Sequence, residues 1–201
     1  MDKRIGLTGG IGSGKTAVAA LLQESGFPVL NLDTIGKEIT DQPKLQSEIR
    51  NTFGPEILSD GQIDRRKLRT LVFTNPVQRK KLEQILHPAI RAEFERRAKT
   101  LIDQGNSVVF CEAALLMENG YSHQLDGLVV VLASEETRKK RVLQRDQISE
   151  DQWKQILGTQ VSDSQRKAQG DLFIENNGSL SDLKAEIPKL ITQMKKKGWL
   201  K

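Results

Sequence analysis

The chain has 201 residues, of which 37% are hydrophobic and 28% charged, a composition typical of a globular protein and not of a disordered one. A formal net charge of +5 suits a protein that handles anions, whether nucleotides, phosphorylated metabolites or nucleic acid. The single cysteine, Cys111, excludes an intrachain disulfide and favours a reducing compartment. Because the longest apolar run (128–133) is too short to cross a membrane and the N-terminal residues lack a signal-peptide pattern, we expect a cytoplasmic protein without a membrane partner.

The first predicted elements form a strand–helix–strand unit. Ile5–Thr8 is a short apolar segment that ends at a glycine cluster, and Gly14–Glu24 has apolar residues at helical spacing. Pro28–Leu32 is a second β-rich segment, followed at once by Asp33. This order predicts a parallel sheet with a right-handed crossover.

About seventy residues separate this unit from the next predicted strand, Ser107–Cys111. The intervening sequence is charged and has helical patterning, with turn signals at Gly54–Pro55 and Asp60–Gly61. Asn75 followed by Pro76 is a good helix start, because Asn caps helices and proline fits the first helical position. The segment is too long for a loop, so we predict a helical insertion between the second and third strands.

The remaining chain continues the alternation of strands and helices. Gly127–Leu132 is a buried strand candidate, Ser134 caps a basic helix that reaches Arg145, and Ser149 opens a further helix with a capping box. Asp171–Glu175 is the last strand and Leu180–Lys197 the closing helix. We therefore predict an α/β fold with a five-stranded parallel sheet flanked by helices. The predicted domains are a nucleotide-binding core (1–34, 102–133 and 168–201), the insertion (35–101) and a lid region (134–167).

One motif carries most of the chemical information. Gly9–Thr16, here called the phosphate loop, matches G-x-x-x-x-G-K-[ST] between a predicted strand and a predicted helix. Its members are Gly9, Gly10, Ile11, Gly12, Ser13, Gly14, Lys15 and Thr16. Glycines let main-chain N–H groups close on phosphate oxygens, and the following helix offers its positive end and the free N–H of Ala17. Lys15 is expected to reach the β- and γ-phosphates of ATP, and the Thr16 hydroxyl to bind Mg²⁺. A chance match in a chain of this length is expected less than about once in a hundred.

The motif narrows the class of protein. Glu112 directly follows an apolar strand, as does the acid that many ATPases place beside Mg²⁺. A GTPase is disfavoured because no N-K-x-D motif occurs. A dinucleotide-binding oxidoreductase is disfavoured because Lys15 stands where that fingerprint needs glycine.

A small-molecule kinase needs an acid near the γ-phosphate and arginines that neutralise the transferred charge. Asp33 is expected at the carboxyl end of the strand next to the first, where open α/β sheets bind ligands. Arg138, Arg141 and Arg145 lie on one predicted helix, and the spacing of the last two places them on one face. Two plainer interpretations stay open: Asp33 could cap a helix that begins at Thr34, and the basic helix could be a solvated surface.

The chain resembles the dephospho-CoA kinase family over nearly its whole length. The matching segments are L-T-G-G-I-G-S-G-K-T at Leu7–Thr16, the strand Val29–Asp33, Leu86-His87-Pro88, Leu115-Leu116-Met117-Glu118, R-x-x-x-R-D at Arg141–Asp146, and a D-x-x-I-x-N-x-G ending at Asp171–Gly178. Three positions depart from the family's pattern: Asn31 stands in place of an aspartate, Glu112 in place of an aspartate, and Ala114 in place of a proline.

The resemblance implies that the γ-phosphoryl group of ATP is transferred to the ribose 3′-hydroxyl of dephospho-CoA, the final step of CoA synthesis. Catalytic roles are implied for Asp33 as the base and for Lys15 and Arg141 as stabilising cations. Further nucleotide contacts are expected from Ala17, Arg145 and Asn177, Mg²⁺ contacts from Thr16 and Glu112, and substrate contacts from Asp33, His87, Leu115 and Glu118. His87 could equally be a packing or capping residue.

Other functions stay open at this point. They are another small-molecule or nucleotide kinase with a phosphate loop, an ATPase that acts on a macromolecule, and a nucleic-acid-binding module. Nucleic acid is disfavoured as a partner because only 4% of residues are aromatic, which leaves few platforms for base stacking. We expect a monomer or a small homo-oligomer.

Overall fold

The computed structural model describes residues 2–200, and the chain divides into two compact units. The first, here called the sheet unit, comprises the chain up to Asn31 and from Ala98 onward. The second, the helical unit, is Leu32–Arg97. Within residues 2–200, no helix combines the length and the apolar character that crossing a membrane requires.

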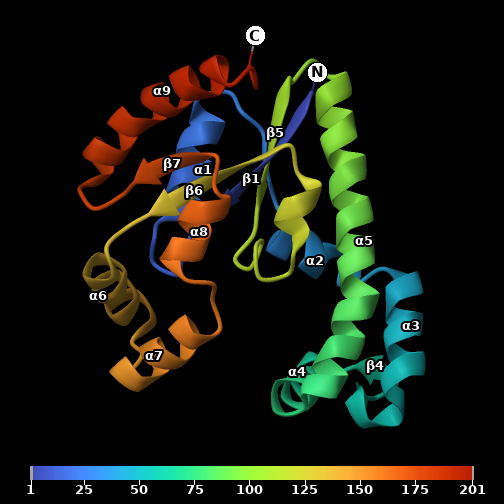
Figure 1. Ribbon diagram of the computed structural model, residues 1–201. Helices are drawn as coiled ribbons and strands as arrows, with labels where there is room; N and C mark the ends of the chain where they lie inside the picture. The colour runs from blue at the N-terminus through green and yellow to red at the C-terminus, as the bar shows by residue number, and fades with distance from the viewer. Residues whose placement is uncertain (1, 201) are drawn as a thin grey trace. The chain divides into compact units, whose positions relative to one another are not determined.

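The sheet unit is built on a five-stranded parallel sheet, as predicted (Figure 1). Its strands are β1 (Lys3–Thr8), β2 (Val29–Asn31), β5 (Val108–Glu112), β6 (Gly127–Leu132) and β7 (Leu172–Glu175), in the order β2-β5-β1-β6-β7. Register is set by pairs such as Gly6 with Cys111 and Gly6 with Leu128. The predicted strands therefore exist within one or two residues of their expected bounds.

One expectation about strand order is wrong. We expected the strand that precedes Asp33 to lie next to β1, but β5 lies between β1 and β2. Every residue of β5 is buried, whereas the three residues of β2 are only partly buried. A parallel strand that is apolar apart from its last residue is stable where neighbours cover both of its sides, and a short, partly buried strand suits an edge.

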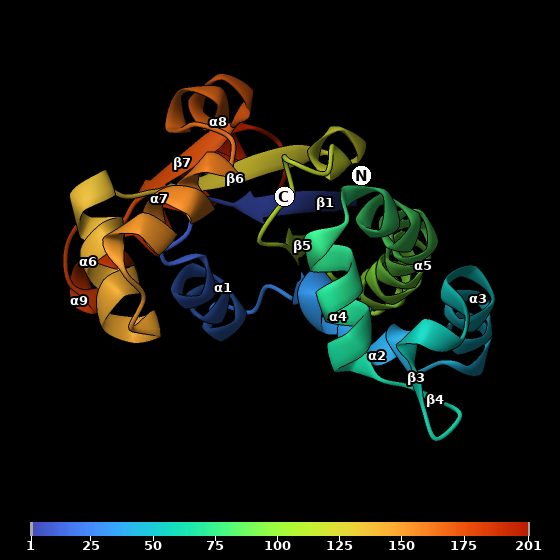
Figure 2. The ribbon, with the colours of Figure 1, turned by 90° about the horizontal axis from the view of Figure 1, so that it is seen from below.

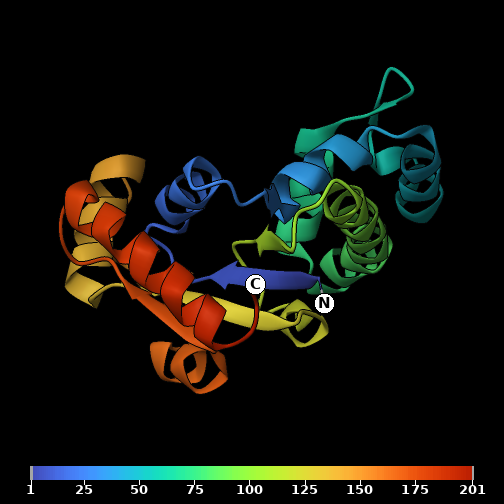
Figure 3. The ribbon, with the colours of Figure 1, turned by 90° about the horizontal axis from the view of Figure 1, so that it is seen from above.

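Helices cover both faces of this sheet. The helices of the unit are α1 (Lys15–Glu24), α6 (Glu135–Asp146), α7 (Glu150–Gly158), α8 (Asp163–Gln169) and α9 (Leu180–Lys196), with a 3₁₀ turn, η2 (Tyr121–Gln124). Figures 2 and 3 show α1 on one face and α8 on the other. Apolar side chains of α1 and α9 pack with those of the sheet into one core, in which Leu22, Phe110 and Met194 are fully buried. The predicted caps are present: Ser134 caps α6, and Ser149 forms a capping box at the start of α7.

The helical unit has its own small core. Its elements are α2 (Leu32–Thr40), α3 (Pro43–Phe53), η1 (Gly54–Ile57), β3 (Leu58–Ser59), β4 (Gln62–Ile63), α4 (Arg65–Thr74) and the greater part of α5 (Pro76–Asp103). Ile49, Phe53, Ile57 and Leu68 form the buried cluster.

Two local signals of this unit, a turn and a helix start, correspond to elements of the structure. The turn predicted at Asp60–Gly61 joins two antiparallel strands of two residues each, too short to show an alternating pattern. The predicted start of α5 is confirmed, because Oδ1 of Asn75 accepts hydrogen bonds from the N–H groups of Val77 and Gln78. The helix continues through Pro88, although proline removes one main-chain hydrogen bond there.

Candidate active site

The phosphate loop connects the end of β1 at Thr8 to the start of α1 at Lys15. Gly12 (φ 75°) and Gly14 (φ 91°) have left-handed backbone conformations that residues with side chains rarely adopt. Gly14 is the N-cap of α1, so the free N–H groups of the first helical turn open toward the loop. A loop of this shape at a helix N-terminus is an anion-binding arrangement.

Asn176 fixes the loop from the opposite end of the chain. Its Nδ2 donates a 2.8 Å hydrogen bond to the main-chain oxygen of Ser13, and the side chain is buried. A methyl group on Gly14 would lie 2.1 Å from this Nδ2, so the close approach requires glycine. Arg141 Nη1 in turn donates to the main-chain oxygen of Asn176 at 2.9 Å. Asn177, the predicted nucleotide contact, accepts a 2.7 Å bond from the N–H of Ser134 through Oδ1.

The role of Asn176 was missed from sequence, although a signal was present. In the D-x-x-I-x-N-x-G pattern of residues 171–178 the asparagine falls on Asn176. The adjacent Asn177 is the exposed member of the pair. Nothing in a strand-end pattern alone tells which of two neighbouring asparagines turns toward the loop.

Lys15 holds its ammonium group against the same loop. Its Nζ donates to the main-chain oxygens of Gly9 at 2.6 Å and Gly10 at 3.4 Å. The side chain is only partly exposed. A positive charge therefore lies beside the N–H groups of the loop, where it would add to the attraction for an anion.

A hydroxyl and a carboxylate meet at the carboxyl end of β5. Thr16 Oγ1 donates to Glu112 Oε1 at 3.4 Å, and Asn31 Nδ2 donates to Glu112 Oε2 at 3.0 Å. Glu112 is only 6% exposed. These oxygen donors suit Mg²⁺, which proteins commonly hold through one or two carboxylates together with the phosphates of a substrate. Between residues 2 and 200 there is no cluster of three or more His, Cys, Asp or Glu side chains that could hold a metal without such help.

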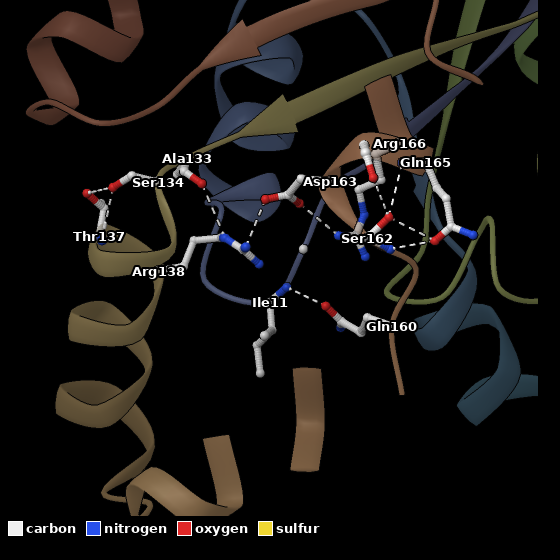
Figure 4. Close-up of polar contacts among 12 residues, drawn as sticks. Ile11, Ala133, Ser134, Thr137, Arg138, Gln160, Ser162, Asp163, Gln165 and Arg166 are labelled. Atoms are coloured by element: carbon white, nitrogen blue, oxygen red, sulfur yellow. Dashed lines mark hydrogen bonds and ion pairs between the residues drawn. The ribbon is translucent and has the colours of Figure 1, made fainter. Parts of the chain in front are cut away.

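Arg138 of α6 and Arg166 of α8 lie beside the phosphate loop at Gly10. Arg138 and Arg166 are both buried, and Figure 4 shows the two side chains on either side of Asp163. Asp163 accepts from Arg138 Nη2 at 2.9 Å and from Arg166 Nη1 at 3.1 Å. Arg166 Nη2 also donates to Glu118 Oε1 at 3.1 Å. Glu118, the predicted substrate contact, thus holds an arginine and also accepts from the N–H of Val161.

The other predicted residues have the following positions. Arg145 is exposed and paired with Asp146, a hydrogen bond that raises the pKa of Arg145 and lowers that of Asp146. Leu115 is 38% exposed in the segment after β5. Asp33 and His87 belong to the helical unit. Asp33 is exposed in the first turn of α2, which begins at Leu32 and not at Thr34, and His87 is partly buried within α5.

Comparisons with known proteins agree on one family. The family model described as dephospho-CoA kinase matches residues 3–182. A dephospho-CoA kinase of Corynebacterium glutamicum is 39% identical over 95% of this chain and 96% of its own length. One from Fusobacterium nucleatum is 38% identical over 89% of this chain and 92% of its own.

Solved structures share the fold, and one of those that match is a dephospho-CoA kinase. A crystal structure of a Thermus thermophilus protein is 34% identical, with a TM-score of 0.82 over 96% of this chain and 98% of that one. A dephospho-CoA kinase from Campylobacter jejuni is 28% identical, with a TM-score of 0.73 over 98% and 100% of the two chains. A shikimate kinase from Acinetobacter baumannii, at 17% identity and a TM-score of 0.52, shares the fold.

Proposed function

Because the chain belongs to the dephospho-CoA kinase family, we propose that it transfers the γ-phosphoryl group of ATP to the 3′-hydroxyl of dephospho-CoA, giving CoA and ADP. This reaction is the final step of CoA synthesis. The observation that carries the proposal at the level of residues is the phosphate loop, held in an anion-binding shape at the start of α1 with Lys15 against it. The comparisons do not favour another acceptor or an ATPase. A cytoplasmic location, without nucleic acid or membrane as a partner, belongs to the same proposal.

Phosphoryl transfer of this kind depends mainly on positioning and on stabilising charge. The N–H groups of the phosphate loop and the Lys15 ammonium would bind the β- and γ-phosphates. Arg141, which lies on α6 and contacts the segment that holds the loop, is our proposed further cation. These groups would stabilise the negative charge on the transferred group as the bond between the γ-phosphorus and the bridging oxygen breaks and ADP leaves.

The acceptor hydroxyl needs a base. We assign this role to Asp33, an exposed carboxylate two residues after the end of β2. It would accept the proton of the 3′-hydroxyl as the oxygen attacks the γ-phosphorus. His87, Leu115 and Glu118 stay our proposals for contacts with dephospho-CoA, and Arg145 and Asn177 for contacts with ATP.

Mg²⁺ is expected to enter with ATP. Thr16 and Glu112 would hold it, since their oxygens already lie 3.4 Å apart and Glu112 is oriented by Asn31. When bound, Mg²⁺ would neutralise part of the phosphate charge. The residues present therefore fit the ion.

One assay tests the function. ADP release is measured with Mg-ATP alone, with dephospho-CoA, with nucleoside monophosphates, and with DNA or RNA, and products are identified by mass spectrometry. We expect stimulation by dephospho-CoA only, with a product heavier by one phosphoryl group. Equal rates without an acceptor, or stimulation by nucleic acid, would contradict the proposal.

A further inference from the structure

Arg138 is a buried cation with one unused donor group. Its side chain is 5% exposed. Nη2 donates to Asp163 at 2.9 Å and Nε donates to the main-chain oxygen of Ala133 at 3.2 Å. Nη1 is buried without a hydrogen-bond partner among the residues that the structure describes. An unpaired donor in such a place costs free energy until an acceptor reaches it.

The unused donor lies at the phosphate loop. A methyl group on Gly10 would come within 2.4 Å of Arg138 Nη1 and within 3.2 Å of Arg166 Nη1. Lys15 Nζ bonds the main-chain oxygens of Gly9 and Gly10. Three cationic side chains therefore lie around the first two residues of the loop.

The next amide of the loop already has an acceptor. The N–H of Ile11 donates to Gln160 Oε1 at 2.9 Å, as Figure 4 shows. Gln160 lies between α7 and α8, the latter of which carries Asp163 and Arg166. A side-chain oxygen thus occupies a position that a phosphate oxygen could take.

The carboxylate that holds Arg138 is less buried than the arginine itself. The Asp163 side chain is 38% exposed, compared with 5% for Arg138. Asp163 also pairs with Arg166, so it keeps a cationic partner if Arg138 turns toward an anion. Asp163 therefore orients the Arg138 guanidinium, while Nη1 of that group stays able to donate to an anion.

We propose that Arg138 binds the β- and γ-phosphate end of ATP through Nη1, and that Gln160 holds the Ile11 amide until a phosphate oxygen replaces it. The inference rests on the proposed function, because it takes ATP as the ligand. The assignment to this end of ATP follows from Lys15, whose counterpart in such loops reaches these phosphates and whose Nζ lies at Gly9 and Gly10.

The test compares two charge-removing variants on the same helix, Arg138→Gln and Lys140→Gln. Lys140 is exposed on α6 and serves as the matched control. Dissociation constants for ATP and ADP are measured by titration calorimetry. We expect Arg138→Gln to weaken ATP binding by about 10- to 100-fold, the effect of one lost charge-assisted hydrogen bond, and ADP binding by less. Lys140→Gln should bind both nucleotides like the wild type.

A third variant separates ligand binding from a structural role. Asp163→Asn breaks the same ion pair but leaves the Arg138 guanidinium in place. We expect it to bind ATP at least as tightly as the wild type, and circular dichroism is used to establish that each variant is folded. If Arg138→Gln does not fold, Arg138→Lys replaces it, with an expected loss of ATP affinity between those of the wild type and the glutamine variant.

A spectroscopic signal accompanies the binding data. The Arg138 guanidinium carbon lies 6.0 Å from the ring centre of Trp153, which is buried. ATP should therefore change the fluorescence of Trp153 in the wild type and not in Arg138→Gln, with Trp199 replaced by Phe in both. The role of Arg138 would be overturned if Arg138→Gln bound ATP as tightly as the wild type, or if Arg138→Gln and Asp163→Asn lost equal ATP affinity. Neither result would contradict the proposed function. A wild type that binds no ATP would instead overturn the proposed function.

Discussion

Each of the two units of this protein contains a cluster of two arginines and two carboxylates. In the sheet unit, Asp163 accepts from Arg138 and Arg166, and Arg166 also contacts Glu118. In the helical unit, Glu93 accepts from Arg96 and Arg97, and Arg97 also contacts Glu38. Each cluster has one carboxylate between two guanidinium groups, one of which also contacts a second carboxylate.

The clusters differ in burial and in the origin of their members. Glu93, Arg96 and Arg97 lie on one helix at spacings of three and four residues, and the Arg96 side chain is 66% exposed. Arg138 and Arg166 come from different helices, are 5% and 3% exposed, and lie beside the phosphate loop. Position, and not the kind of charge, distinguishes the two clusters. The Glu93 cluster joins residues of α5 to Glu38 of α2, whereas the buried Asp163 cluster lies beside the phosphate loop.

The largest loss of activity is expected when Lys15 of the phosphate loop is replaced. Lys15→Ala removes the ammonium that lies against Gly9 and Gly10, and we expect kcat/KM to fall by about 10³-fold or more, because this charge would stabilise the transition state directly. Steady-state kinetics with ATP and dephospho-CoA provide the measurement. Arg96→Ala, which removes a cation from the helical cluster, is the control and should retain full activity. A fully active Lys15→Ala enzyme would contradict a catalytic role for the cations at the phosphate loop.

The second largest loss of activity is expected from Asp33, a proposed catalytic residue outside the sheet unit. Asp33 belongs to the helical unit, yet we assign it a catalytic role. Asp33→Asn should lower kcat by about 10²- to 10³-fold with little change in ATP affinity, because the amide cannot accept the proton. The loss should not exceed that of Lys15→Ala. A kcat within a fewfold of wild type would show that Asp33 only serves the first turn of α2.

A smaller effect is expected from the asparagine pair after β7. Asn176→Ala removes a buried hydrogen bond to Ser13 and should lower the free energy of unfolding by about 2 kcal/mol, measured by urea denaturation. Asn177→Ala removes the acceptor for the Ser134 N–H, where the residue is exposed, and should cost about 1 kcal/mol or less. The reverse order would mean that Asn177 and not Asn176 secures this part of the sheet unit.

The smallest effect is a pH-dependent change in stability, and it concerns Glu93 with Arg96 and Arg97. The hydrogen bond from Arg96, with a further bond from Arg97, lowers the pKa of Glu93 from its ordinary 4.5 to about 2. Since the folded pKa lies below the unfolded one, the stabilisation is fully present above pH 4.5 and is lost as the pH falls toward 2. Glu93→Gln should therefore be less stable than wild type by about 1 kcal/mol at pH 7, and the gap should close between pH 4.5 and 2.

The matched control for this prediction is Glu83→Gln. Glu83 lies on the same helix, paired with Arg79 at 3.5 Å with both side chains well exposed. Its replacement should change stability by less than about 0.5 kcal/mol at any pH, and neither variant should alter kcat. An activity loss in Glu93→Gln would contradict the division drawn between the two clusters.

Much of the molecule was determined by local sequence. The parallel sheet, the phosphate loop and the caps at Asn75, Ser134 and Ser149 followed from hydrophobic runs, glycine spacing and capping side chains. These signals depend on residues within a few positions of one another, so a single sequence displays them. The same holds for Glu93, Arg96 and Arg97, whose helical spacing alone brings them together.

Strand order and the contacts of Asn176 and Arg138 depend on tertiary structure and could not be predicted from residue spacing. Only the folded chain puts β5 between β1 and β2, turns Asn176 and not Asn177 toward Ser13, and brings Arg138 to Gly10 beside Arg166. From sequence, Arg138, Arg141 and Arg145 lie on one predicted helix, and only Arg141 and Arg145 were given roles there. Burial distinguishes them: Arg138 faces inward against α8 and the phosphate loop, whereas Arg145 faces solvent and pairs with Asp146. The physical reason is that contacts across more than a hundred residues depend on which elements pack against each other. Hydrophobic periodicity shows which face of an element is buried, but not which element covers it.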